Sequence, residues 1–185
     1  SVVSVTDKTG PRDAAQGFVE AGIIDDGAPA RGVGGGISQF ATTLYNASYF
    51  AGLDDVEHKE HSYYISRYPA GREATVFEGA IDLRLGNDGP TPVYIRTQWT
   101  PQSITVQLYG QKRFDVTSEP GPRTAPTPPG ERDLGGNPAC TPSEGTGGFT
   151  ITDTRVLRDV RTGAVRREPR TVHYEPQPRI TCNGP

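Results

Sequence analysis

The chain has 185 residues, 33% of them hydrophobic, and its 19 basic and 22 acidic residues leave a formal net charge of −3. This length holds one core of ordinary size, and the spread of charge gives no electrostatic footprint for nucleic acid or an anionic membrane. No apolar run approaches the ~20 residues of a membrane span, so we expect neither nucleic acid nor a membrane span in this chain. The many glycines and prolines, 23 and 17, favour extended structure and long turns over helix.

The N-terminal third leads to a glycine-rich turn. Residues 1–6 are rich in β-branched side chains and predict a strand, whereas residues 13–21 fit a short helix or an irregular segment. Three consecutive glycines follow: Gly34, Gly35 and Gly36. Glycine permits positive φ and close approach of the backbone, so this triplet predicts a tight turn that feeds the next element. No lysine follows it, and its spacing fits neither the P-loop nor the dinucleotide fingerprint, so we expect no cofactor.

The segment after the glycines predicts one buried helix. Its apolar side chains recur at steps of four, three and four residues, at Phe40, Leu44, Ala47 and Ala51. Ser38 stands where this helix begins and Gly52 where it ends. A serine at that place is either an N-cap or a nucleophile beside the free N–H groups of the first turn.

Two histidines, His58 and His61, follow the helix. Residues 62–68 predict a strand by their aromatic and branched content, which puts His61 at the start of that strand. A histidine there is either structural, bonded to backbone, or a general base. Two histidines three residues apart also occur in metal sites, but a third convincing ligand is lacking, and we expect no metal.

Three alternating segments, 80–85, 92–99 and 103–109, predict an antiparallel meander. Their apolar rows give the helix a surface to cover. We therefore predict an α+β fold in which a central buried helix packs on an antiparallel sheet.

The C-terminal part divides into two segments. Residues 117–147 are rich in proline and glycine and predict an extended linker, and residues 148–185 predict a β-hairpin extension. The hairpin arginines form a basic ribbon. It is either a solvated strand face that protects an edge from pairing with another strand, or a surface that contacts an acidic wall polymer. Cys140 and Cys182 lack the close spacing of metal knuckles, so we predict a disulfide that ties the extension and an oxidising, extracytoplasmic compartment. We therefore expect the chain to be an excised soluble ectodomain.

The motif Gly34-Gly35-Gly36-Ile37-Ser38-Gln39-Phe40-Ala41-Thr42-Thr43-Leu44-Tyr45-Asn46-Ala47 resembles the hallmark of the VanW family. The opening of that family is similar to Gly10-Pro11-Arg12 and Gly17-Phe18 of this chain. Its second signature is similar to His61-Ser62 together with the segment 69–76. The resemblance covers roughly residues 1–110 of a core domain that we place at 1–116. Ser38 departs from the pattern, because most members have cysteine there, so a cysteine-based reaction is not carried over.

The family resemblance implies a cell-wall setting, since VanW is named for an accessory place in glycopeptide-resistance clusters. A residue at the start of a buried helix, followed in sequence by a histidine on an antiparallel sheet, is also the layout of papain-like and transglutaminase-like enzymes. In that layout Ser38 is the nucleophile and His61 the base, and Asp82, Asn87 and Gln98 are candidates for a third, orienting group.

Two functions therefore stay open. The first is a non-catalytic envelope domain that binds peptidoglycan or another wall component. Its cleft is predicted to be lined by Gly34, Gly35, Gly36, Gln39, Tyr45, His61, Tyr63 and Arg72. The second is acyl transfer or amide hydrolysis on wall peptides through Ser38 and His61, with Arg72 binding a peptide carboxylate. The sequence makes no prediction of oligomeric state.

Overall fold

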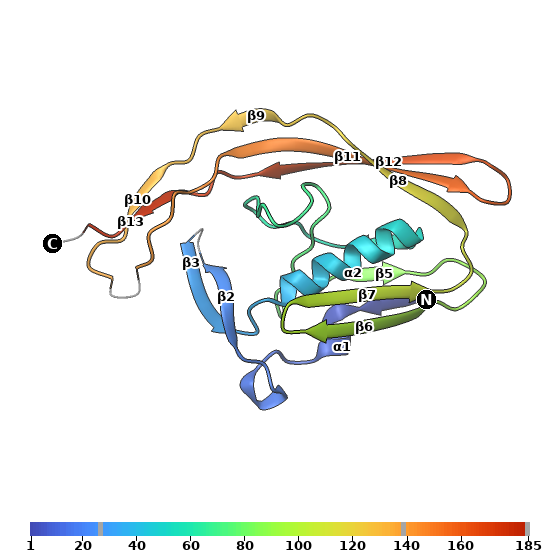
Figure 1. Cartoon of the computed structure of the whole chain (residues 1–185), viewed down its shortest axis with the longest axis horizontal. Helices are drawn as coiled ribbons and strands as arrows, with labels where there is room; N and C mark the ends of the chain where they lie inside the picture. Colours follow the sequence, from blue (N-terminus) through green and yellow to red (C-terminus); the bar gives the residue numbers. More distant parts are fainter. Residues whose placement is uncertain (26–27, 138–139, 184–185) are drawn as a thin grey trace.

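Helix α2 (Ile37–Ala51) lies at the centre of the fold (Figure 1). The long ribbon of β11 (Gly148–Asp159) and β12 (Val165–Tyr174) passes over one side of it, and the hairpin of β6 (Tyr94–Thr100) and β7 (Ser103–Tyr109) lies on the other. The structure, a computed structural model, describes residues 1–25, 28–137 and 140–183. The predicted α+β class, with one main helix packed on antiparallel strands, is confirmed.

Both ends of α2 are fixed by glycine. Gly36 occupies the N-cap with a φ of 83° and provides no side-chain cap, so of the two roles open to Ser38 the structure does not bear out the N-cap. Ser38 lies within the first turn instead. At the other end Gly52 has a φ of 75°, and its N–H bonds to the carbonyls of Ser48 and Tyr49, which confirms the predicted stop.

The buried face of α2 differs from the predicted one. Of the predicted row, Leu44 is buried, Phe40 and Ala47 are half-buried and Ala51 is exposed. Strands pack on the helix from more than one side, at β7, β8 (Phe114–Pro120) and β4 (Asp54–Glu57), so the buried face includes polar residues. Its members are Ala41, Thr42, Leu44, Tyr45, Ser48 and Tyr49.

The predicted three-strand meander is wrong in its first member. β5 (Arg84–Gly86) lies between β1 (Val2–Ser4) and β4 (Asp54–Glu57) in a separate antiparallel sheet, while β6 and β7 pair with each other. The reason is the turn after β5, where the Asn87 side chain donates to the Thr91 carbonyl and directs the chain away. Leu83 and Leu85 are buried in the main core with Val5, Leu44 and Tyr45.

Three short elements complete the N-terminal part. The predicted first strand is confirmed only as β1, because Ser4 then caps α1 (Val5–Thr9) by accepting the Asp7 N–H at 3.0 Å. Residues 13–21 contain the 3-10 helix η1 (Ala14–Gln16) and the start of β2 (Glu20–Asp25). β2 pairs with β3 (Ala28–Val33) in a hairpin beside the start of α2 (Figure 1).

The C-terminal hairpin is confirmed and joins a larger sheet. β8 (Phe114–Pro120) pairs with β11, as does β9 (Thr124–Thr127), whereas β10 (Glu131–Asp133) pairs in parallel with β13 (Arg179–Thr181). Segments 114–120 and 124–133 therefore lie along the hairpin. The hairpin arginines are largely paired with carboxylates, namely Arg155 and Arg166 with Glu168, Arg167 with Glu119, and Arg170 with Glu60.

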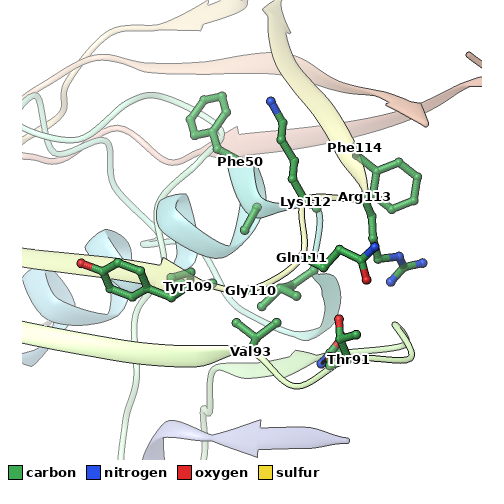
Figure 2. Close-up of a pocket in the computed structure, with 14 residues that line it drawn as sticks. Phe50, Thr91, Val93, Tyr109, Gly110, Gln111, Lys112, Arg113 and Phe114 are labelled. Carbon is green, nitrogen blue, oxygen red and sulfur yellow. Dashed lines mark hydrogen bonds between the residues drawn. The ribbon is translucent and has the colours of Figure 1, made fainter. Parts of the chain in front are cut away.

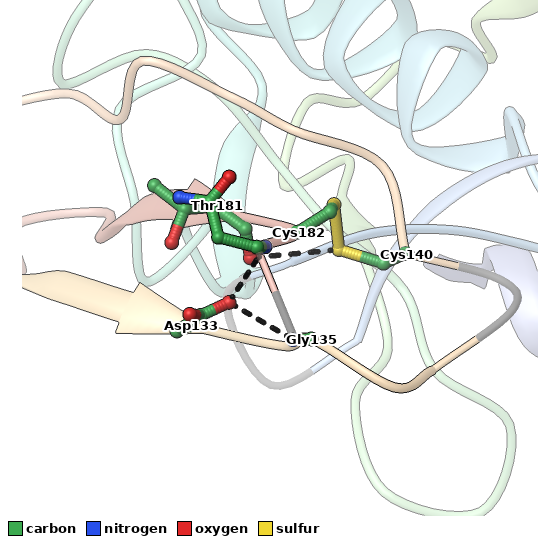
Figure 3. The surroundings of a disulfide bond; sticks show 6 residues. Asp133, Gly135, Cys140, Thr181 and Cys182 are labelled. Atoms are coloured by element: carbon green, nitrogen blue, oxygen red, sulfur yellow. Dashed lines mark hydrogen bonds between the residues drawn. A yellow bond between two sulfur atoms is a disulfide. The ribbon is translucent and has the colours of Figure 1, made fainter. Parts of the chain in front are cut away.

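The disulfide between Cys140 and Cys182 is present, with a Cα–Cα distance of 5.9 Å. Figure 3 shows it beside Asp133, whose carboxylate accepts the N–H groups of Gly135 and Asn183. The bond fixes the end of the chain next to the β10–β13 pair. None of the helices in the described residues is long and apolar enough to cross a membrane.

Candidate functional site

The three glycines form the turn that leads into α2, and the backbone requires glycine at each of these positions. Gly34 and Gly36 have φ values of 80° and 83°, which side-chain-bearing residues rarely adopt. Gly35 lies against β2, where an added Cβ would come within 2.7 Å of the Ala21 carbonyl carbon and oxygen. The turn that begins α2 is therefore pressed onto the β2 backbone.

This contact gives a testable expectation. Gly35→Ala should lower the free energy of unfolding by about 3 kcal/mol, the upper part of the range for forced overpacking, because the clash is with backbone that cannot rotate away. Gly130→Ala is the matched control, since nothing lies within 4 Å of its added Cβ. Its effect should stay within about 1 kcal/mol. Urea unfolding of both variants measures the difference, and equal stabilities would contradict the close approach.

The two signature segments meet along the helix. Ser38 Oγ lies 3.0 Å from Thr75 Oγ1, and Thr42 Oγ1 both donates to the Ala74 carbonyl at 3.0 Å and accepts its N–H at 3.1 Å. One turn further, Asn46 Nδ2 donates to the Arg72 carbonyl at 2.7 Å. Polar side chains spaced four apart on α2 thus hold the segment 72–75 along its length.

The same segment carries a buried partner for His61. His61 Nδ1 lies 2.7 Å from Glu73 Oε2, and the Glu73 side chain is fully buried. The antiparallel bridge between Lys59 and Thr75 sets this register, since it puts residue 61 opposite residue 73. The ring of Tyr68 stacks on the imidazole with centroids 5.6 Å apart.

The predicted orienting groups are wrong, because Glu73 takes that place. Asp82 instead accepts the Ser4 hydroxyl and the Thr6 N–H at the start of α1, which lowers its pKa although burial opposes the shift. Asn87 holds a turn, and Gln98 is exposed on β6. Glu73 lies within the second signature, in the segment 69–76. Predicting that residues 59–61 pair with residues 73–75 would have identified Glu73 as the partner of His61.

Ser38 and His61 each contact the segment 73–75, but they do not bond to each other. Ser38 contacts Thr75 and His61 contacts Glu73, two residues apart on the same side of an extended stretch, which corresponds to about 6–7 Å along the chain. Among the described residues no hydrogen bond joins the two. The predicted strand 62–68 is also wrong, because this segment turns at Ile65–Tyr68 and Tyr64 enters an aromatic cluster with Phe149 and Tyr174.

The other predicted binding residues divide between two places. Gln39 is exposed on the first turn of α2, and Tyr63 is half-buried and paired through its backbone with Glu175. Arg72 lies over the Phe50 ring at 5.1 Å and 4.0 Å from Asp153, so its guanidinium already has partners. Tyr45 is buried about two turns further along α2 than Ser38.

Tyr45 belongs to a charged seam between α2, β4 and β12. Its ring lies 4.1 Å from that of His58, whose Nδ1 is 2.6 Å from Asp55 and whose Nε2 is 3.3 Å from Glu60. Arg170 on β12 pairs with both carboxylates. A cavity of about 420 Å³ opens beside them, lined also by Tyr49, Asp153, Arg155 and Glu168. The seam joins the C-terminal ribbon to the core.

The seam should make stability fall at alkaline pH. Burial disfavours the charged imidazole, but Asp55 and Glu60 together outweigh it, so the pKa of His58 is raised. A raised folded-state pKa stabilises fully below the unfolded value of about 6.5 and is lost as pH rises through the folded value. As pH rises above about 6.5, the free energy of unfolding should therefore fall more steeply than in His58→Gln, by up to about 1.4 kcal/mol per pH unit. Superimposable pH profiles of the two proteins would refute this role.

A second pocket lies at the C-terminal end of α2. It has a volume of about 260 Å³ and is shown in Figure 2, where Phe50, Val93 and the loop Gly110–Phe114 surround it. Of the predicted site residues, only Asn87 lines it, where its side chain holds a turn. The candidate site is therefore the opposite, N-terminal end of the helix.

Fold and site together define an α+β domain in which a serine on the central helix and a histidine contact the same segment, the serine at Thr75 and the histidine at Glu73. The chain belongs to the VanW family: the family described as "VanW like protein" matches residues 1–109. Over 100 residues it is 39% identical to the uncharacterized protein YoaR of Bacillus subtilis (strain 168), which covers 54% of this chain and 33% of that protein. The chain thus spans about a third of that relative. Comparison with solved structures finds no match.

Proposed function

We propose that the chain is an extracytoplasmic cell-envelope domain that binds the peptide part of peptidoglycan, or of a similar wall component, at the N-terminal turn of α2. The observation that carries the proposal is the meeting of the two signatures there. Helix N–H groups without intrahelical partners attract a carboxylate, and the segment that contacts Ser38 through Thr75 contacts the His61 imidazole through Glu73. Wall peptides end in carboxylates. The polar side chains of that first turn are Ser38, which is half-buried, and Gln39, which is exposed.

Sedimentation with purified sacculi tests this proposal. Gln39→Glu keeps the size of the side chain and suits a helix N-terminus, but it adds a negative charge where a carboxylate would bind. At about 4 Å this repulsion is worth about 1 kcal/mol or more, so retention should fall about fivefold. Gln98→Glu, the same change at an exposed position on β6, is the control and should bind like wild type. Absence of wild-type retention would refute binding.

The His61–Glu73 contact favours a second candidate function, acyl transfer or amide hydrolysis on wall peptides. A carboxylate accepts from Nδ1–H, which leaves Nε2 as the base. Ser38 Oγ would attack the amide carbonyl carbon, its proton would pass through His61 to the leaving amine, and water or another amine would release the ester. This requires Ser38 to exchange its Thr75 contact for His61.

Incubation with soluble muropeptides, followed by mass spectrometry, separates the two candidates. Wild type, Ser38→Ala and Ser38→Cys are compared. A binding domain gives no product with wild type or Ser38→Ala. Product from wild type that disappears in Ser38→Ala would favour the enzyme, and product from Ser38→Cys alone would mark a lapsed enzyme.

A further inference from the structure

Tyr174 links the C-terminal ribbon to the candidate site, although it lies outside the family-matched residues 1–109. It sits at the end of β12, is fully buried, and packs against Phe149 and Tyr64 with ring centroids 5.0 and 5.5 Å apart. Its hydroxyl oxygen accepts the N–H of Gly71 at 2.8 Å. The ribbon therefore reaches the second signature through a side chain.

The hydroxyl proton of Tyr174 needs an acceptor, because a buried O–H without one is costly. Gly71 is two residues before Glu73, whose carboxylate is equally buried and binds His61 through Oε2 only. Oε1 of Glu73 is buried and accepts no well-aligned hydrogen bond. Burial raises the pKa of Tyr174, and the negative charge of Glu73 raises it further. A small adjustment of either side chain would satisfy both groups.

We propose that Tyr174 is a positioning residue of the candidate site, which holds the buried Glu73 carboxylate so that Glu73 fixes the orientation and tautomer of His61. The importance of Tyr174 for ligand binding rests on the proposed function. Its effect on the orientation and tautomer of His61 does not depend on that function. The consequence is that the C-terminal extension completes a site whose signatures both lie in the N-terminal part.

Long-range proton–nitrogen spectra of the histidine rings in the full chain test this role. In wild type, His61 should carry its proton on Nδ1, with the resonance assigned by its loss in His61→Gln. Tyr174→Phe removes only the hydroxyl and should leave His61 as a mixture of tautomers. Binding of a soluble disaccharide-pentapeptide muropeptide should weaken at least threefold. Tyr64→Phe is the control, because it removes a hydroxyl from the same ring cluster and should change neither readout.

A folded Tyr174→Phe protein with an unchanged His61 spectrum would overturn the proposal. If that variant does not fold, Glu73→Gln tests the same link, since it must shift the hydroxyl proton resonance of Tyr174, and an unshifted resonance would be equally fatal. Failure of wild type to bind muropeptide would remove the proposed function alone. The tautomer comparison would still decide whether Tyr174 positions His61.

Discussion

Replacing Arg155 with alanine should lower the melting temperature by roughly 6–12 °C, which corresponds to about 3 kcal/mol in a chain of this size. Arg155 is 6% exposed and comes from β11. Its Nε and Nη2 donate to the Tyr49 carbonyl at 3.0 and 2.7 Å, and Nη2 also donates to Leu53 O at 2.9 Å. Tyr49 lies in the last turn of α2 and Leu53 directly after its Gly52 cap, at the end of the helix where the dipole favours a cation.

The loss has two sources. The variant removes the hydrogen bonds of Arg155 to the Tyr49 and Leu53 carbonyls, and it removes a guanidinium that lies 5.0 Å above the Tyr49 ring. Arg158→Ala is the control on the same strand, because Arg158 is exposed and makes only a 3.5 Å contact to the Gly163 carbonyl. It should stay within about 0.5 kcal/mol of wild type. Equal melting temperatures for the two variants would mean that the ribbon does not hold α2.

Reduction of the Cys140–Cys182 bond should cost about 4 kcal/mol in the chain-entropy model for the 42-residue separation of the two cysteines. The reason is that the bond restricts the unfolded chain, while β10 and β13 are short and exposed over most of their residues. Thermal unfolding with and without reductant measures the effect. The Cys140→Ser, Cys182→Ser double variant should unfold at the temperature of the reduced protein, and added reductant should not change that temperature. A change below 1 °C would show that pairing of β10 with β13 suffices alone.

The sequence predicts α2 well because its determinants are local. Gly34–Gly36, the helical spacing and Gly52 each act within a few residues, and the hairpin around Gly163 is local in the same way. The buried face of the helix is less predictable, since two of the strands that cover it, β7 and β8, are distant in sequence. Tyr45 and Ser48 are buried for that reason.

Part of the candidate site also depends on distant pairing. Ser38 and His61 were selected from position and resemblance, but Glu73 becomes a partner of His61 only through the bridge between Lys59 and Thr75. Tyr174 approaches the site only because β12 packs over the second signature. Neither contact leaves a periodic signal in the sequence.

Amide and imidazole resonances of isotope-labelled protein, recorded while a soluble disaccharide-pentapeptide muropeptide is added, measure the use of this site most directly. Binding at the N-terminal turn of α2 predicts saturable shifts at Ser38, Gln39 and His61, while Tyr109 and the pocket at the other end of the helix stay unchanged. Saturable shifts confined to that other pocket, or none at all, would contradict it.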